Sequence, residues 1–551
     1  MINKVKKRID SVFLGTIAFM AIIVISVKFI ALPNNLIFSD EGWYLCLLRD
    51  LPHFGATRFH LLFNNVFKNN IYAIRLACLL LQLLSSAFMA MCMAIWTQKY
   101  YSNYSIRKLT VLFFCATVLG QKGIEACPSF NYINLNKVCV EMGVGFLLLG
   151  LAKKKSFNYL LSGFMLAFLF PIMIPNVIVF PFVIAVVFLL SVNKVRDVIA
   201  LIMGVFVFAF GYMVFVESPS QIIADIVHET ENVVDRGKND YGWLFYVNWM
   251  IDTVMYLSKW FFIALSIFGI YHLLIKQKSL ILKNKYFRFS IIGALSTVIL
   301  LYSWYYIPPV FPVVNNHLFT GGKDLHWVLL FLLILFDLIE KKTIRYEELI
   351  FSILLLIVPL TLSFGSNVSF YVRHGAYFVF ITPLILYYSL KRSAKWKTII
   401  LCFFVFTFAM SIIGYFGKNW HGEKHFGHQV SVKTIGINQN VRLTNEYIEA
   451  LVDCRNHIPP NAKILCSAEN WGVVSLLNYT PICYDFNIDK NGVERIQKIV
   501  EETVAEDGHL WIIAAQDNQS FMDKLNSIKG YDMSVDTGYR SFYIYAQKSI
   551  K

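Results

Sequence analysis

The sequence is short of charged residues, and this shortage argues against a soluble globular protein. Asp, Glu, Lys and Arg together make up 15% of the 551 residues, whereas 57% are hydrophobic and 16% are aromatic. Soluble domains contain roughly 45–50% apolar residues. The composition therefore predicts a chain that crosses a membrane many times.

Cysteine patterns for metal binding or for a disulfide framework are also missing. The chain has ten cysteines and no C-x-x-C pair. The C-terminal part holds three of them, Cys454, Cys466 and Cys483, which is an odd number. Others lie inside apolar segments, where a thiol behaves as a small hydrophobic group. The cysteines thus indicate neither a zinc site nor a disulfide scaffold.

The net charge of +15 comes from cations that are scattered between apolar segments. No long basic face forms, so nucleic acid is not an expected partner. Basic loops on the cytoplasmic side and contact with anionic membrane lipids explain the charge better. No small-residue cleavage site follows the first apolar segment, residues 12–32, so we expect this segment to remain as a helix.

Apolar segments long enough to cross a bilayer, which takes about 20 residues, recur along the chain. We predict about 13 transmembrane helices. They start near Val12, Ile71, Leu109, Val138, Tyr159, Asn176, Val198, Met250, Phe289, His326, Leu349, Ala376 and Ile399. The spans in the middle of the chain are nearly free of charge, which is unlike a transporter.

Lysine and arginine in the short loops predict the orientation. They collect at the N-terminus and after the even-numbered spans, as at Lys99, Lys153 and Lys276. These positions all fall on one side, which the positive-inside rule makes the cytoplasmic side. We therefore expect a protein of the bacterial inner (plasma) membrane, with its N-terminus in the cytoplasm and its C-terminal part outside the cytoplasm.

The composition changes near residue 418. Residues 418–436 read as a polar linker, and residues 437–551 alternate between helical and strand patterns. Strands are expected at 463–466, 481–485, 510–515, 531–535 and 541–546, and helices at 444–456, 492–505 and 520–528. This predicts a small extracytoplasmic α/β domain after a transmembrane domain of residues 1–417. The small domain has no glycine-rich phosphate loop and no nucleophile elbow.

The stretch Phe38-Ser39-Asp40-Glu41-Gly42-Trp43-Tyr44 follows the first span directly. Ionisable side chains at the edge of a membrane are costly and are candidates for function. The residues that follow predict a short amphipathic helix along the interface. The alternative is that Asp40 and Glu41 are a solvated cap of that helix, because acids are common at helix starts.

This layout resembles the GT-C glycosyltransferases, in the branch of the protein O-mannosyltransferases and the lipid A aminoarabinose transferase. The resemblance rests on Ser39 to Tyr44, on Phe130-Asn131-Tyr132 and on Leu161-Ser162-Gly163 with Pro171, within the first two hundred residues. It implies a GT-C-like helical fold. It also implies transfer of a sugar from a polyprenyl-phosphate carrier to a lipid, glycan or protein acceptor on the outer face.

In this resemblance Asp40 matches the first acid of the family and is the candidate base, because an attacking hydroxyl must lose its proton. Glu41 orients Asp40 or binds the acceptor. Cations on the outer face would stabilise the departing phosphate. The substrate-binding candidates are Arg58, Lys122, Glu125, Lys323, Arg373 and His374. The competing interpretation for each cation is contact with anionic lipid.

A divalent metal ion such as Mg²⁺ or Mn²⁺ is a further candidate partner. Asp40, Glu125, Asp225, His228 and Glu229 carry oxygen or imidazole groups that suit such ions. Asp225, His228 and Glu229 have helical spacing, but a solvated loop helix explains them as well. Sequence alone leaves the metal ligands unknown.

Three other functions stay open. A polysaccharide polymerase or ligase that uses lipid-diphosphate-linked glycans would also need cations on the outer face. A transporter or flippase predicts charges in the middle of spans and broken helices at matched positions. A receptor-like sensor would need an output module on the cytoplasmic side, and none is evident.

Overall fold

The structure is a computed structural model of the chain. It describes all residues except 1, 35, 37, 39, 53–57, 64–65, 68–69, 102–103, 122–128, 225–226, 228–242, 277–316, 342–344, 364–377, 391, 417–427, 461, 468–469, 485–487, 489–492, 508–510, 516–518, 528–531, 540–541 and 549–551.

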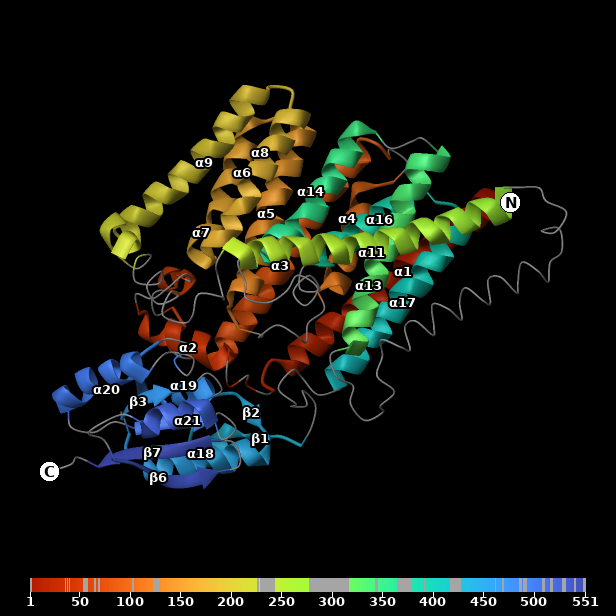
Figure 1. Ribbon diagram of the computed structural model, residues 1–551. Coiled ribbons are helices and arrows are strands. Elements are labelled where there is room, and N and C mark those ends of the chain that lie inside the picture. Colours follow the sequence, from red (N-terminus) through yellow and green to blue (C-terminus); the bar gives the residue numbers. More distant parts are fainter. Residues whose placement is uncertain are drawn as a thin grey trace.

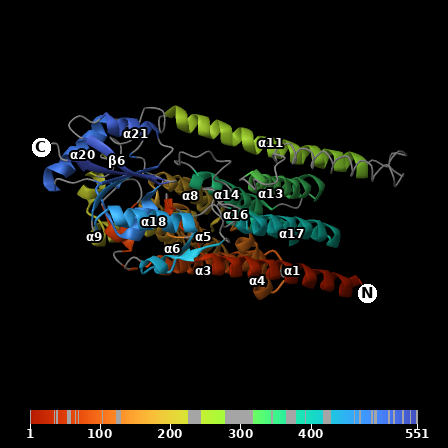
Figure 2. The same cartoon turned by 90° about the horizontal axis from the view of Figure 1, so that it is seen from below.

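A bundle of helices forms the larger part of the molecule (Figure 1). Its helices are α1 (Ile2–Ala31), α3 (Ile71–Gln98), α4 (Ile106–Gly120), α5 (Tyr132–Lys153), α6 (Ser156–Ala167), α7 (Leu169–Ile172), α8 (Val179–Leu190), α9 (Lys194–Phe215), α11 (Trp243–Lys276), α13 (His317–Leu335), α14 (Tyr346–Ser363), α16 (Phe378–Leu390) and α17 (Ala394–Phe416). Helix α11 runs along one side of the bundle (Figure 2).

The predicted spans agree well with these helices. Each predicted start lies in or beside a described helix, except those at Phe289 and Ala376, which lie outside the described residues. Within the described part of the chain, five helices are long and apolar enough to cross a membrane: Ser11–Ala31, Ile71–Gln98, Tyr132–Lys153, Lys194–Phe215 and Val247–Gly269. Other apolar helices, such as Phe378–Leu390, are shorter. The expected membrane protein of many helices is confirmed.

Local sequence explains where several helices begin. Asn70 caps α3 by accepting a hydrogen bond from the backbone N–H of Ala73 at 3.0 Å. Asn131 caps α5 in the same way through the N–H of Asn134 at 2.8 Å. Asn and Ser satisfy the first N–H groups of a helix, which have no partner inside it.

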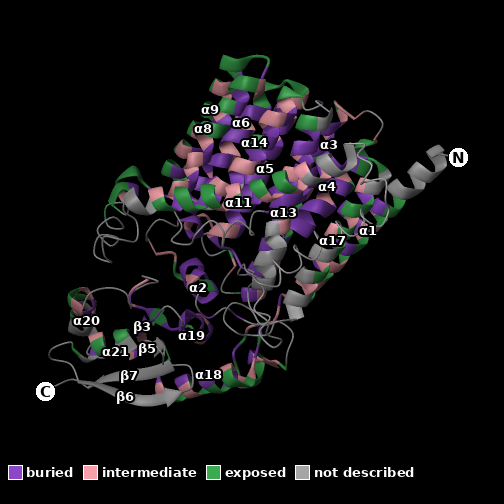
Figure 3. Ribbon diagram, turned by 45° about the vertical axis from the view of Figure 1, so that its right-hand side comes forward, coloured by how far each residue is buried: buried purple, intermediate pink, exposed green. Residues whose placement is uncertain are grey.

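Burial divides the bundle into an inner and an outer group of helices (Figure 3). Helix α16 is buried along its whole length. Helices α9 and α11 instead carry exposed apolar side chains, such as Phe210, Phe215, Met255 and Phe262. A row of exposed large apolar groups is costly in water. We therefore interpret the outer sides of α9 and α11 as surfaces that face lipid.

The C-terminal part is an α/β domain that lies against one face of the bundle, called here the domain face (Figure 1). Its strands are β3 (Lys463–Cys466), β4 (Thr480–Pro481), β5 (Trp511–Ala515), β6 (Asp532–Tyr539) and β7 (Phe542–Lys548), and its helices are α18 (Asn445–His457), α19 (Trp471–Leu477), α20 (Val493–Asp507) and α21 (Gln519–Asn526).

The strand order in this domain is β4-β3-β5-β7-β6. Strand β3 is parallel to β4 and β5, whereas β7 is antiparallel to β5 and β6. The predicted closing antiparallel pair is therefore confirmed. Strand β1 (Val430–Ser431) pairs with β2 (Arg442–Leu443). Residues 430–431, which fall inside the predicted linker 418–436, thus form a strand.

Candidate functional site

The short helix predicted after Ser39 is confirmed as α2 (Asp40–Asp50), which lies between the bundle and the C-terminal domain (Figure 1). Asp40 and Glu41 occupy its first turn, where negative charge is favoured by the exposed N–H groups and the helix dipole. The side chain of Asp40 is exposed, whereas Glu41 is fully buried. Two neighbouring acids therefore have opposite environments.

Glu41 is held by Arg75 of helix α3. The guanidinium donates from Nε to Oε1 and from Nη2 to Oε2, both at 2.7 Å, and neither side chain is exposed. The Ser129 hydroxyl also donates to Oε1 of Glu41. Such a bidentate, charge-assisted pair is both strong and directional. Its geometry fixes the first turn of α2 on the bundle and engages both oxygens of Glu41.

Arg75 also anchors the chain that leads into α2. Its Nη1 donates to the backbone oxygens of Leu32 at 2.5 Å and Asn34 at 3.3 Å. Sequence reasoning missed Arg75 and Ser129 as partners of Glu41. A signal existed, because Arg75 is a cation inside the second predicted span, and such residues usually face a partner inside the bundle.

Arg58, a predicted substrate-binding residue, is buried beside Glu217. Its Nη1 lies 3.5 Å from Glu217 Oε2, and both side chains are fully buried. The Tyr212 hydroxyl donates to the same carboxylate at 3.0 Å, and the Arg58 backbone N–H donates to Pro171 O at 2.6 Å. Through these contacts Arg58 holds the segment after α2 against the end of α9.

The other predicted site residues are described only in part. Lys323 lies in α13, but its side chain is not described. Lys122, Glu125, Arg373 and His374 lie outside the described residues, as do Asp225, His228 and Glu229. In the described part of the chain, no group of three His, Cys, Asp or Glu side chains is placed to hold a metal ion.

A chain of hydrogen bonds between polar side chains crosses the inside of the bundle from α1 to α5. The Glu141 carboxylate on α5 accepts hydrogen bonds from the hydroxyls of Ser85 and Ser86 on α3. Gln121 Nε2 donates to Ser86 Oγ at 2.7 Å, and Lys28 Nζ donates to Gln121 Oε1 at 3.1 Å. Polar side chains of α1, α3 and α5 and of the residue after α4 therefore meet inside the bundle, and Lys28 and Glu141 are the charged groups among them. Lys137 is buried on the same helix as Glu141.

The C-terminal domain contacts both ends of α2. Trp43 Nε1 donates to Tyr484 O at 2.9 Å. At the other end, the Arg49 guanidinium donates to Tyr479 O at 2.7 Å and to Asn478 Oδ1 at 3.2 Å. Burial raises the pKa of the Cys46 thiol, in the middle of this helix, to about 12. The thiol is therefore neutral and packs as an apolar group.

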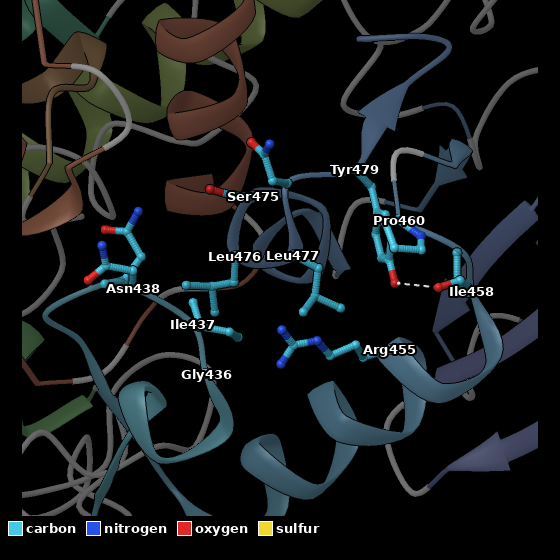
Figure 4. A pocket seen from close by; sticks show the side chains of 12 residues that line it. Gly436, Ile437, Asn438, Arg455, Ile458, Pro460, Ser475, Leu476, Leu477 and Tyr479 are labelled. Carbon is cyan, nitrogen blue, oxygen red and sulfur yellow. Dashed lines mark hydrogen bonds between the residues drawn. The ribbon is translucent and has the colours of Figure 1, made fainter.

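A cavity of about 360 Å³ lies in the C-terminal domain beside the Arg49 contact (Figure 4). The Arg455 side chain points into it, and Asn438, Ser475 and Tyr479 also line it. Arg455 Nη1 donates to Ile435 O. Because Asn478 both lines the cavity and accepts a hydrogen bond from Arg49, the cavity adjoins the contact between the domain and α2.

No family model matches the chain, and no curated protein matches it. Among solved structures, the chain is similar to ArnT from Cupriavidus metallidurans bound to undecaprenyl phosphate. The similarity covers 97% of this chain and 98% of that chain, with 11% sequence identity and a TM-score of 0.42. At this distance no residue role can be transferred, so the roles below rest on contacts within this chain.

Proposed function

We propose that this protein is an integral-membrane glycosyltransferase. It takes a sugar from a polyprenyl-phosphate carrier and gives it to a lipid, glycan or protein acceptor. The proposal rests on the different environments of the two acidic residues that begin α2. Glu41 is buried and paired with Arg75, whereas Asp40 is exposed at the start of the same helix. A carboxylate beside a membrane and open to solvent can reach both a lipid-linked donor and an acceptor.

The chemistry assigned to Asp40 is that of a general base. The acceptor hydroxyl oxygen attacks the anomeric carbon while Asp40 takes the hydroxyl proton. The bond between the anomeric carbon and the phosphate oxygen breaks, and the phosphate leaves with the electron pair, which inverts the configuration. Cations stabilise the charge that grows on the phosphate. Lys122, Lys323, Arg373 and His374 remain our candidates for that role.

The proposed orientation follows the loop charges. The N-terminus lies in the cytoplasm of a bacterium, and the domain face with its C-terminal domain lies outside the inner membrane. A reporter fused after residue 551, active only outside the cytoplasm, tests this orientation. Activity of that reporter supports the assignment, and activity of a matched cytoplasmic reporter at the same position contradicts it.

The function is tested by measuring sugar transfer with purified protein. A panel of radiolabelled polyprenyl-phosphate sugars is offered with a crude extract of lipids and glycans, with Mg²⁺ or Mn²⁺ present or with EDTA. Wild type is compared with Asp40→Asn, and thermal unfolding shows that both are folded. We expect transfer by wild type and a loss on the order of 10²–10⁴-fold in Asp40→Asn, the usual contribution of a positioned base.

Two results would point elsewhere. Transfer only from lipid-diphosphate-linked glycans would favour a polymerase or ligase. A transporter is the second candidate function, because Glu141 and Lys137 are buried charged groups within a membrane-spanning helix. Movement of a labelled lipid across proteoliposomes by wild type, without any transfer and with loss in Glu141→Gln, would favour that candidate.

A further inference from the structure

Helix α2 and helix α19 of the C-terminal domain touch backbone to backbone at the end of α2 that carries Asp40. The Gly472 N–H donates to Phe38 O at 2.6 Å. A Cβ atom on Gly42 would overlap the backbone nitrogen of Gly472, and one on Gly472 would lie 2.6 Å from Phe38 Cδ1. A side chain on Gly42 would need the backbone of α19 to move, and one on Gly472 would need Phe38, just before α2, to move. The contact therefore sets how closely the start of α2 approaches the domain.

Aromatic residues complete the contact around the first turn of α2. The Phe38 ring stacks on Tyr447 of α18, with centroids 4.3 Å apart and an angle of 15°. Trp43 reaches across to the backbone oxygen of Tyr484 at 2.9 Å. Stacked rings and a satisfied indole N–H hold two groups in defined orientations. The chain just before Asp40 and the turn after it are therefore both bound to the domain.

The far end of α2 is bound as well. Arg49 Nη1 donates to Val474 O at 3.4 Å and Nη2 donates to Tyr479 O at 2.7 Å. These carbonyls lie near the end of α19, where cations are favoured because the last carbonyls have no partner in the helix. Asp50 accepts a hydrogen bond from the Tyr484 hydroxyl at 2.8 Å. The domain thus contacts α2 at both of its ends.

The opposite side of α2 is fixed to the bundle by the Glu41–Arg75 pair. Asp40 therefore begins a helix that is fixed on one side by contacts with the bundle and on the other side by contacts with the C-terminal domain. From this geometry we propose that the C-terminal domain positions Asp40, and that Gly472 is the positioning residue. This inference rests on the proposed function, because it assumes that the place of Asp40 matters for transfer.

A base works only at hydrogen-bond reach of the proton that it takes. A displacement of about 1 Å can cost on the order of 10²-fold in rate. A positioning role for Gly472 therefore predicts a loss in kcat when the α2–α19 contact is opened, while binding of the lipid donor to the bundle changes little.

The test opens this contact with Gly472→Ala and, from the other helix, Gly42→Ala. The matched control is Gly211→Ala in α9, where a new Cβ would meet nothing within 4 Å. We expect kcat to fall on the order of 10–10²-fold in both interface variants, with the donor KM changed by less than about twofold. Thermal unfolding identifies any variant that does not fold.

A second readout does not depend on transfer. Backbone hydrogen exchange of residues 40–50 should become faster in Gly472→Ala and Gly42→Ala and stay unchanged in Gly211→Ala. Trp43→Phe, which keeps a ring but removes the hydrogen bond to Tyr484, is the milder variant if both alanine variants fail to fold. It should show the same changes to a smaller extent.

The outcomes distinguish a failure of the positioning role from a failure of the proposed transferase function. Faster exchange in α2 together with lower kcat supports the positioning role. Faster exchange with full transfer, or lower kcat with unchanged exchange in α2, overturns it. If wild type transfers no sugar from any donor, the proposed function fails by itself, and the exchange measurement still shows whether the domain fixes α2.

Discussion

Two of the buried pairs of arginine and carboxylate, Arg75–Glu41 and Arg392–Asp337, differ in what surrounds them. At the domain face, Arg75 and Glu41 pair at 2.7 Å directly beside the exposed Asp40 and under the C-terminal domain. The second pair lies where the end of α13 meets the turn between α16 and α17, a region called here the far face. There Arg392 and Asp337 pair at 3.0 Å, and the guanidinium lies over the rings of Phe336 and Trp396.

The comparison shows that a buried ion pair can hold helices together anywhere in the bundle. Whether it also positions a functional residue depends on what lies next to it. Both pairs join separate helical segments, because burial makes each charge depend on its partner. Only the domain-face pair, of these two, fixes a helix whose first residue is an exposed acid. The predictions below remove parts of each region in turn.

The largest effect on stability is expected from Arg75→Met and Arg392→Met. Each leaves a buried carboxylate without its cation, which costs about 3–5 kcal/mol. Arg75→Met should also lower transfer per folded molecule, because α2 loses its hold on the bundle, whereas Arg392→Met should not. Thermal unfolding and transfer assays on the same preparations measure both quantities. The exposed Arg107→Met is the control.

Equal loss of transfer per folded molecule in Arg75→Met and Arg392→Met would remove the distinction between the two regions. Full stability of either variant would show that its pair does not hold helices together.

A smaller effect is expected from Glu348→Gln at the far face. The Tyr387 hydroxyl donates to Glu348 Oε1 at 2.7 Å, and both side chains are buried. A hydrogen bond to a charged group contributes about 1.5–3 kcal/mol, and the amide keeps an acceptor, so the loss should lie near or below the lower value. Thermal unfolding should show this loss, and transfer should stay at the wild-type rate. Reduced transfer in a folded Glu348→Gln protein would extend the site to the far face.

The smallest effect is expected from Tyr484→Phe, which removes the hydrogen bond to Asp50. Because this hydrogen bond is exposed and water can replace it, its loss costs about 0.5–1.5 kcal/mol, less than for a buried bond to a carboxylate. Burial raises the pKa of Tyr484, and the nearby Asp50 charge raises it further. This stabilisation is present below the ordinary tyrosine pKa and is lost as the pH rises through the raised value. Stability curves should therefore fall less steeply above about pH 10 in Tyr484→Phe. Identical slopes would contradict this.

Sequence patterns predicted the elements better than their contacts. Length and hydropathy placed the helices, a short apolar run placed β5, and a strand pattern placed β7, because these signals are local. The acidic pair also predicted α2. The pairing of Glu41 with Arg75 was missed because a single arginine in a predicted span does not indicate which acidic residue it pairs with. The contact of Phe38 with Gly472 joins residues from the two ends of the chain, and a glycine pattern gives no sign of it.

The central claim is that Asp40 performs proton transfer while Glu41 holds the helix. The most direct measurement compares kcat per folded molecule for Asp40→Asn and Glu41→Gln beside wild type, with thermal unfolding of each. The account predicts that Asp40→Asn keeps its stability and loses on the order of 10²-fold or more in kcat. It predicts that Glu41→Gln is less stable by about 3–5 kcal/mol because Arg75 is left buried without its counter-charge, yet its folded molecules lose less kcat than Asp40→Asn. A wild-type kcat in Asp40→Asn would contradict the account. So would a Glu41→Gln protein that keeps its stability and loses more kcat than Asp40→Asn.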